Sequence, residues 1–294
     1  MRPVAGYAGT FGTARIYIVE IEPGIHQITV GAEPFAGFPP PNAFLVAGTE
    51  HSVLIDCGWD GQADHDERLA AISAAGAPPL TALILTHRHP DHAGGALRLH
   101  EATRVPIACH PLDREAIETE RLGRQATVAH ELGGGERYDL GGLSVEIIFT
   151  PGHTVGCIAP WVPERGALFA SDTVMAISTT VVRPGEGDIA QYADTLVRML
   201  ALNAKTIYTG HGPAVRDPER QLRMLIARRA EREAELLAAL AGGTRGAEEL
   251  RDIIYGALPD PRLPLALAQV RSMLAKLAAE GFAAEDDDGR WRRA

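Results

Sequence analysis

Short apolar runs, rich in β-branched residues and separated by Gly, Pro and Asn, recur through the first 213 residues of this chain. Runs of this length and composition predict β-strands. We expect strands at residues 24–30, 43–46, 52–55, 82–85, 105–109, 143–149, 158–162, 167–170 and 206–209, with helices at 66–75, 113–121 and 189–202. Because a meander of strands is mixed with crossover helices, the pattern predicts an α/β sandwich with its chemistry in loops at the strand ends.

The rest of the chain has a different pattern. Its expected elements are a long amphipathic helix at 218–240, helices at 247–255 and 266–280 separated by a Pro-rich break at 258–264, and a hairpin at 282–293. The hairpin is indicated by Asp288-Gly289 between two short extended runs. Helix, helix and hairpin is the order of a winged-helix module, and a helical cap over the main domain is the alternative. We therefore expect domains at 1–241 and 242–294.

Composition excludes several classes of protein. Hydrophobic residues make up 46% of the chain and charged residues 22%, which is globular rather than disordered. No apolar run approaches the roughly 18 residues of a membrane span, and the first residues lack the order of a secretory signal, so we expect a cytoplasmic protein without a membrane partner. Cys57, Cys109 and Cys157 are too scattered for a disulfide framework or a cysteine zinc cluster, and we expect core thiols.

The net charge of −10 is unevenly distributed. From Ala214 onward the sequence carries 14 Lys and Arg against 14 Asp and Glu, so the excess negative charge belongs to residues 1–213. Phosphate contacts need cations, which argues against a broad polyphosphate-binding surface in this first part.

The segment that carries most chemical information is Thr86-His-Arg-His-Pro-Asp-His-Ala-Gly-Gly95, directly after an expected buried strand. A loop at a strand end can turn three imidazoles and one carboxylate into a single cavity. These donors suit Zn²⁺, iron or manganese without a thiolate. The candidate metal ligands of this segment are His87, His89, Asp91 and His92.

Further candidate ligands follow other apolar runs. His153, Asp172 and His211 each lie in a turn directly after an expected strand. Any one of them alone could be a turn residue, but together they extend the donor set to seven side chains. By contrast, six isolated histidines have no partner at ligand spacing and are interpreted as surface or satisfied core residues: His26, His51, His65, His100, His110 and His130.

In this order, the motifs resemble those of the metallo-β-lactamase superfamily over about residues 20–213. The resemblance implies an αββα sandwich in which one metal ion binds His87, His89 and His153, the other binds Asp91, His92 and His211, and Asp172 bridges them. It also implies that Asp56, in Leu54-Ile-Asp-Cys-Gly58, holds the motif loop from behind. The small C-terminal domain is then winged-helix-like.

Spacing narrows the resemblance. The true zinc β-lactamases usually lack the bridging Asp and are exported, whereas this sequence has Asp172 and no export signal is expected. Some nucleases of the superfamily carry a large inserted cap before the last His, and the span from Asp172 to His211 is too short to contain one. The sequence is similar to the glyoxalase II group and, through Thr209-Gly-His-Gly-Pro213, Gly187-Asp-Ile-Ala-Gln-Tyr192 and the tail, to the β-lactamase-like protein 2 family. Characterised relatives in that family are single-strand-specific endoribonucleases and polyketide thioesterases.

The chemistry expected from such a site is hydrolysis. Two divalent ions about 3.5–4 Å apart would lower the pKa of a shared water towards about 7, so that a metal-bridging hydroxide attacks the substrate. Asp91 and Asp172 are the expected catalytic carboxylates, and zinc is the first choice of metal, with iron and manganese as alternatives. An ester or thioester is the preferred substrate. Single-strand-specific cleavage of RNA and a non-catalytic module that binds nucleic acid or a protein partner are the alternatives.

Apolar residues near the expected site favour an acyl substrate. Phe35 and Phe38 lie in a Pro- and Gly-rich hairpin that could form the wall of a substrate pocket, and Met175 lies in the apolar run after Asp172. An ordinary packed turn is the alternative interpretation of the hairpin.

Overall fold

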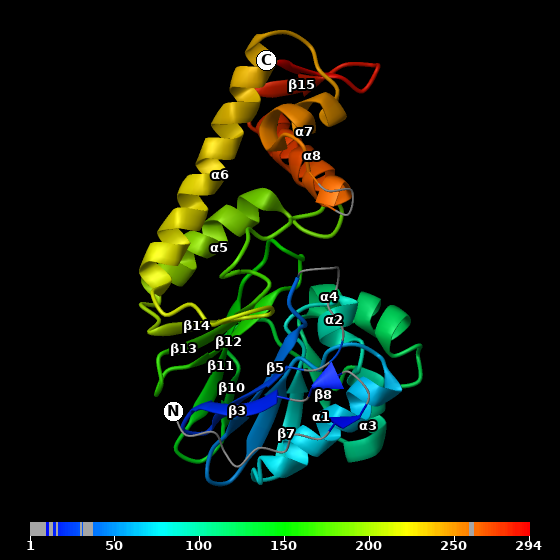
Figure 1. Cartoon of the computed structure of the whole chain (residues 1–294), viewed down its shortest axis with the longest axis vertical. Coiled ribbons are helices and arrows are strands. Elements are labelled where there is room, and N and C mark those ends of the chain that lie inside the picture. Colours follow the sequence, from blue (N-terminus) through cyan, green and yellow to red (C-terminus); the bar gives the residue numbers. More distant parts are fainter. Residues whose placement is uncertain (1–9, 12–13, 16, 30, 32–37, 259–261) are drawn as a thin grey trace. The chain divides into compact units, whose positions relative to one another are not determined.

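The structure, a computed structural model, describes residues 10–11, 14–15, 17–29, 31, 38–258 and 262–294. Its contacts divide the chain into two compact units. The first unit consists of residues 1–150, 156–178 and 205–216, and the second of residues 151–155, 179–204 and 217–294. The elements of both units are labelled in Figure 1.

The first unit contains a seven-stranded sheet. In spatial order its strands are β3 (Tyr17–Glu22), β4 (Ile25–Thr29), β5 (Asn42–Ala47), β6 (Ser52–Ile55), β7 (Leu80–Ile84), β8 (Ile107–Cys109) and β9 (His130–Glu131). Pairing is antiparallel from β3 to β6 and parallel from β6 to β9. A separate antiparallel pair is formed by β1 (Thr10–Phe11) and β2 (Ala14–Arg15).

A five-stranded sheet completes the sheet layers of this unit (Figure 1). Its strands are β10 (Arg137–Asp139), β11 (Ser144–Phe149), β12 (Ile158–Val162), β13 (Ala167–Ser171) and β14 (Thr206–Thr209). Adjacent strands are antiparallel except β13 and β14, which are parallel. The register of that parallel pair shifts between Phe169 and Ser171, which marks a β-bulge.

Two apolar clusters explain why the inner strands are almost wholly hydrophobic. The cluster between the sheets combines residues such as Ile55 and Ile84 of the larger sheet with Ile147 and Phe169 of the smaller one. The cluster on the outer face of the larger sheet includes Leu83 and is covered by α1 (Gln62–Ala74), α3 (Ala96–Thr103) and the π-helix η1 (Ile117–Arg121). Successive side chains point to opposite faces, so a strand buried on both faces needs apolar residues throughout.

The second unit is mostly helical. Its elements are α5 (Ile189–Ala201), α6 (Pro218–Ala241), α7 (Ala247–Tyr255), α8 (Leu263–Ala279) and a hairpin of β15 (Ala283–Glu285) and β16 (Trp291–Arg293). Helix α5 packs on α6 and α8, and α7 packs on α8. The Pro151–Val155 segment belongs here because the Thr195 hydroxyl donates to the Pro151 carbonyl oxygen at 2.8 Å.

Every strand expected from the apolar runs is present, but some expectations need correction. The expected helix at 113–121 is two elements, α4 (Pro111–Ala116) followed by η1. The expected break at 258–264 is too long, because α8 begins at Leu263 and places Pro264 in its first turn, where a missing N–H costs no hydrogen bond. The order α7, α8, hairpin agrees with the winged-helix pattern, while the domain boundary at residue 241 stays a prediction.

The cysteines are core thiols, as expected. Cys57, Cys109 and Cys157 are buried, and none of these three forms a disulfide. Burial raises the pKa of the Cys57 and Cys109 thiols to about 12, so both stay protonated at neutral pH. None of the helices in the described ranges is both long enough and apolar enough to span a membrane.

Gly48, in the turn between β5 and β6, provides a test of sheet-to-sheet packing. A Cβ atom at this position would lie 2.0 Å from the carbonyl oxygen of Leu140, which precedes β11 of the other sheet. Gly48→Ala must therefore displace backbone, and we expect it to lower the free energy of unfolding by about 1–3 kcal/mol. Gly133→Ala is the control, because the nearest atom to its Cβ would be a side-chain oxygen at 3.7 Å. Equal thermal unfolding midpoints for the two variants would contradict this packing.

Candidate metal centre

The candidate site residues of the first unit lie where its parallel strands end. Asp56 follows β6, the His87–His92 segment follows β7, Asp172 follows β13 and His211 follows β14. Because parallel strands end at one edge of a sheet, these loops can converge, and loops at such an edge carry function. Each of the two sheets supplies part of the donor set.

The motif loop has a defined local structure. Residues Thr86 to His89 are extended or bent, and the short helix α2 (Pro90–Ala93) then begins with Pro90 in its first turn. Pro90 suits this position because its fixed φ is already helical. The backbone N–H of Cys57 donates to the carbonyl oxygen of His92 at 2.8 Å, which ties the helix to the end of β6.

One group of candidate ligands is formed by Asp91, His92 and His211. Each offers one donor atom, and these atoms lie within 4.8 Å of one another. The Nε2 atoms of His92 and His211 are 3.3 Å apart, and Oδ2 of Asp91 lies 3.2 Å from Nε2 of His211. Both imidazoles are buried. Two imidazoles and one carboxylate are a common set of protein ligands for one divalent metal ion.

A second group contains His87, His89 and Asp172, whose donor atoms also lie within 4.8 Å of one another. The two groups adjoin, since the ring centroids of His87 and His92 are 4.5 Å apart. Oδ1 of Asp172 lies 3.5 Å from Nε2 of His92 and 3.7 Å from Nε2 of His211. The Asp172 carboxylate therefore faces both groups.

The orientation of the rings suits a cation. Nδ1 of His92 faces Oδ2 of Asp56 at 2.9 Å, and Nδ1 of His211 faces the carbonyl oxygen of Pro39 at 2.9 Å. Both partners are acceptors, so each Nδ1 donates a proton to its partner and each Nε2 faces the other ring as the atom that would bind a metal ion. A divalent ion bound by both nitrogens would take the place of any proton on them.

Gly210 leaves the space that such an ion needs. A Cβ atom at this position would lie 2.3 Å from Oδ1 of Asp172 and 2.7 Å from Cε1 of His92. Any side chain there would collide with two members of the donor set. The donor chemistry and this open position both fit divalent metal ions.

The half-buried carboxylates of Asp91 and Asp172 dominate the electrostatics of the group. Burial alone would lower the pKa of His92, but the carboxylates of Asp172 and Asp91 outweigh it and raise that pKa well above its ordinary value. Burial would raise the pKa of Asp91, but His92 and His211 outweigh it and hold the pKa below its usual value. The negative charge concentrated here attracts cations.

A hydrogen-bond network behind the ligands includes two residues that the sequence did not single out. Asp56 accepts from the backbone N–H of Thr86 at 2.8 Å, from the Thr86 hydroxyl at 2.8 Å and from the Ser171 hydroxyl at 3.1 Å. Oδ2 of Asp56 also lies 2.9 Å from Nδ1 of His92, and its expected role in holding the motif loop stays a prediction. Thr86 and Ser171 directly precede His87 and Asp172, so a hydroxyl residue next to each ligand is the signal that could have identified them.

The other residues expected at the site are His153, Phe38, Met175 and Phe35. His153 lies in the Pro151–Val155 segment of the second unit, where its Nδ1 donates to the Val181 carbonyl oxygen at 2.8 Å. The Phe38 ring centroid is 4.9 Å from that of His211. Met175 is buried, and Phe35 lies outside the described residues. The roles of His153 and Met175 stay predictions.

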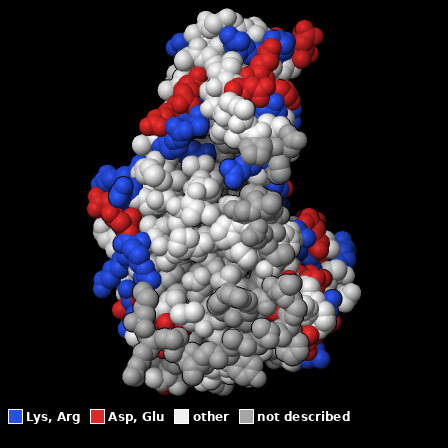
Figure 2. Space-filling view, viewed as in Figure 1, with Lys and Arg blue, Asp and Glu red and all other residues white. Residues whose placement is uncertain are grey.

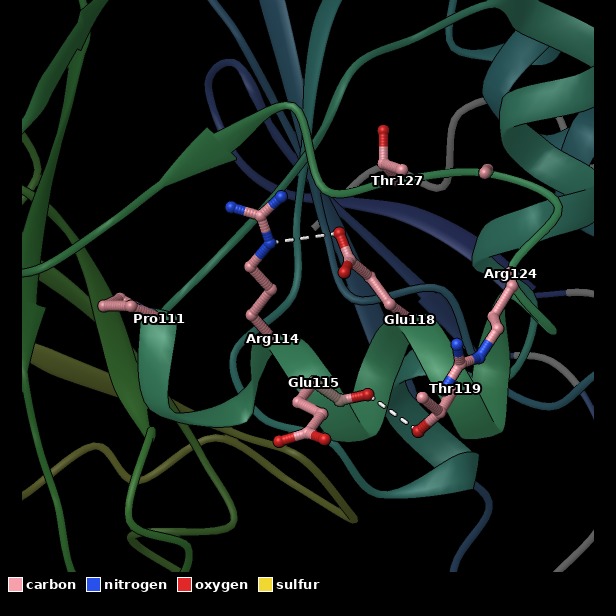
Figure 3. A pocket seen from close by; sticks show the side chains of 8 residues that line it. Pro111, Arg114, Glu115, Glu118, Thr119, Arg124 and Thr127 are labelled. Atoms are coloured by element: carbon pink, nitrogen blue, oxygen red, sulfur yellow. Dashed lines mark hydrogen bonds and ion pairs between the residues drawn. The ribbon is translucent and has the colours of Figure 1, made fainter.

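A surface pocket near α4 and η1 lies apart from the motif loop in sequence and in lining residues (Figure 3). Within it, Arg114 pairs with Glu118 at 3.0 Å, and the Thr119 hydroxyl donates to the Glu115 carbonyl oxygen at 2.7 Å. Arg114 also pairs with Glu131 at 2.6 Å. Because these charges satisfy one another, the pocket does not compete with the metal centre as a candidate reaction site.

Three relatives are similar to this chain over most of its length. It is 30% identical to the lactamase-like protein adaB of Aspergillus niger, over 92% of this chain and 88% of the relative. It is 26% identical to a beta-lactamase-like protein 2 homolog of Caenorhabditis elegans, over 82% of this chain and 79% of the relative. It is 27% identical to the atrochrysone carboxyl ACP thioesterase of Aspergillus fumigatus, over 74% of this chain and 69% of the relative.

The fold is shared with solved structures. A beta-lactamase domain protein from Burkholderia ambifaria superposes with a TM-score of 0.82 and 21% identity, over 98% of this chain and 96% of that one. The sequence profile of the metallo-beta-lactamase superfamily matches residues 36–211, and that of the beta-lactamase associated winged helix domain matches residues 247–291. The expected fold, the winged-helix domain and the resemblance to the β-lactamase-like protein 2 group are confirmed. This chain belongs to the metallo-beta-lactamase superfamily of hydrolases.

Proposed function

We propose that this protein hydrolyses an ester or thioester of a small acyl compound with two divalent cations, zinc first and iron or manganese as alternatives. The observation that carries the proposal is the position of Asp172, whose carboxylate faces both groups of candidate ligands. A carboxylate placed in this way can bridge two ions and set their separation. A cytoplasmic location is part of the same proposal.

Two sets of residues would hold the ions, with Asp172 shared between them. One set is His87, His89 and His153, and the other is Asp91, His92 and His211. Support for including His153 comes from the chain itself, because the Thr150 N–H donates to the Cys157 carbonyl oxygen at 2.9 Å and closes the loop that carries it. Its Nδ1 is also bound to the Val181 carbonyl oxygen, and a second hydrogen bond of this kind commonly orients a histidine that binds a metal ion.

Divalent cations at this centre would acidify a water molecule and polarise the carbonyl oxygen of the substrate. Asp91 is the residue we assign to proton handling. Its lowered pKa keeps it ionised at neutral pH, so Oδ2 can accept a proton from the attacking water. The new bond joins the water oxygen to the carbonyl carbon, the ester or thioester bond breaks, and the proton passes to the departing oxygen or sulfur.

An apolar surface beside His211 supports an acyl substrate. The ring of Phe38 packs near the His211 imidazole, and Ile177 is 50% exposed. A Cβ atom at Gly212 would lie 3.5 Å from Pro39 and 3.6 Å from Ile177, so both flank the turn that carries His211. Exposed apolar side chains next to polar donors are typical of a site for an apolar ligand.

The charges of the second unit favour acyl chemistry over RNA cleavage. Three of its cations are paired with carboxylates: Arg271 with Glu248 at 3.1 Å, Lys276 with Glu233 at 2.7 Å and Arg290 with Glu249 at 3.0 Å. In Figure 2, Lys and Arg are interspersed with Asp and Glu over the C-terminal elements. Phosphate binding would have to compete with these pairs. One relative is also named as a thioesterase, which supports the same choice.

Metal content tests the ligand sets. Reconstituted wild-type protein should hold about two divalent ions per chain by elemental analysis, and His211→Ala should lose mainly one of them because His211 belongs to one set. His130→Ala is the matched control, since its imidazole is exposed on β9 and should leave metal content unchanged. One ion or none in the wild-type protein would refute the paired site.

The bridging role of Asp172 predicts a loss of turnover. We expect Asp172→Asn to lower kcat by on the order of a hundredfold or more, because a ligand shared by both ions is weakened. Circular dichroism should show an unchanged fold. Asp287→Asn, in the exposed hairpin turn, is the control. A near-normal kcat in Asp172→Asn would exclude the bridging role.

Substrate choice is tested by salt dependence. We expect a higher kcat/KM for an aryl or coenzyme-A thioester than for a single-stranded oligonucleotide, with little change between low and high salt for the uncharged aryl thioester. Efficient metal-dependent cleavage of the oligonucleotide with a steep salt dependence, and only trace thioesterase activity, would establish the ribonuclease instead. Binding of nucleic acid without turnover of either substrate would establish the non-catalytic module.

A further inference from the structure

Ser171 ends strand β13 in a conformation that serine rarely adopts. Its φ is 45°, in the left-handed region where glycine is the unstrained residue. The β-bulge between Phe169 and Ser171 leads into this residue, and bulges commonly redirect a side chain next to a functional site. Ser171 is nevertheless buried and keeps a side chain.

The Ser171 hydroxyl joins the two sheets at the candidate metal centre. It donates to Oδ2 of Asp56 at 3.1 Å and accepts from the Thr86 hydroxyl at 2.9 Å, and both of these partners belong to the edge of the larger sheet. Asp56 also has a left-handed backbone, with a φ of 58°. Two strained residues on different sheets are therefore held by one hydrogen bond between their side chains, and such strain persists where surrounding structure enforces it.

The proton directions along this network are consistent. Nδ1 of His87 lies 3.1 Å from the Thr86 hydroxyl oxygen, which can accept its proton. Thr86 gives its own proton to Ser171 or to Asp56, and Ser171 gives its proton to Asp56. Asp56 also accepts from Nδ1 of His92. One ligand from each group, His87 and His92, thus connects to the same carboxylate.

We propose that Ser171 is a positioning residue that fixes the adjacent Asp172 against the motif loop through Asp56 and Thr86. This inference rests on the proposed function. Asp172 follows Ser171 directly, so the bond from Ser171 to the larger sheet determines how far the Asp172 carboxylate lies from the histidines of that sheet. Loss of the hydroxyl leaves Thr86 bonded to Asp56 but removes this link to the smaller sheet.

Two substitutions separate the hydroxyl from backbone strain. Ser171→Ala removes the hydroxyl and keeps the strain, whereas Ser171→Gly removes both. Arg104→Gly is the matched control, because Arg104 is exposed, has a φ of 61° and lies at the end of α3. If Ser171 had only a structural role, Ser171→Gly would be as stable as wild type or more so, and metal binding would be unaffected.

The experiment measures Zn²⁺ affinity by competition with a chromophoric chelator and the ligand environment by the visible absorption of bound Co²⁺. We expect Ser171→Ala and Ser171→Gly to bind Zn²⁺ about 10–100-fold more weakly and to change the Co²⁺ spectrum alike, although Ser171→Gly has the higher unfolding midpoint of the two. For the thioester substrate, kcat should fall while KM changes little. Arg104→Gly should match wild type in affinity and spectrum.

The outcomes are distinguishable. Wild-type affinity and spectrum in both Ser171 variants would overturn this inference and leave the proposed function standing. Weakened binding in Ser171→Ala with full recovery in Ser171→Gly would also overturn it, because strain rather than the hydroxyl would then be responsible. A wild-type protein that binds neither ion would overturn both the inference and the proposed function.

Discussion

The buried carboxylate of Asp56 holds the site together. A buried charge is costly unless it is hydrogen-bonded, and Asp56 accepts from the N–H of Thr86 at one end of the motif loop and from Nδ1 of His92 at the other. The loop between these two points is therefore clamped at both ends. The same carboxylate accepts from Ser171 on the other sheet, so one side chain fixes the loop internally and relative to its partner strand.

The excess negative charge of the chain lies in the part that contains the candidate metal centre. Residues 1–213 carry the full net charge of −10, and this includes the carboxylates of the candidate site. A negative field draws in metal cations and repels polyanions. Arg271, Lys276 and Arg290 of the second unit are held in ion pairs, with which any phosphate would have to compete.

Local sequence patterns predicted the buried strands, and they also indicated the His and Asp residues that the structure brings together in the candidate groups. Buried strands are visible as apolar runs, and a histidine or aspartate directly after such a run locates the site, as for His211 after β14. Strands β3, β9 and β10 were not predicted, because short or partly exposed strands lack a continuous apolar run. The Asp56–Ser171 bond joins residues 115 positions apart, and no local pattern encodes which hydroxyl meets which carboxylate. Helix α8 begins at Leu263, earlier than the expected start at residue 266, because Pro264 was taken as a helix breaker although proline suits the first turn of a helix.

The parallel pairing of β13 with β14 also has a consequence while the chain is being synthesised. Parallel neighbours require a crossover, and here most of the chain between them, residues 179–204, belongs to the helical unit. A chain emerging from the ribosome thus exposes the motif loop long before His211 exists. Contacts of such sequence separation form slowly. Until these contacts form, a nascent chain exposes the candidate ligands of the motif loop without the imidazole of His211.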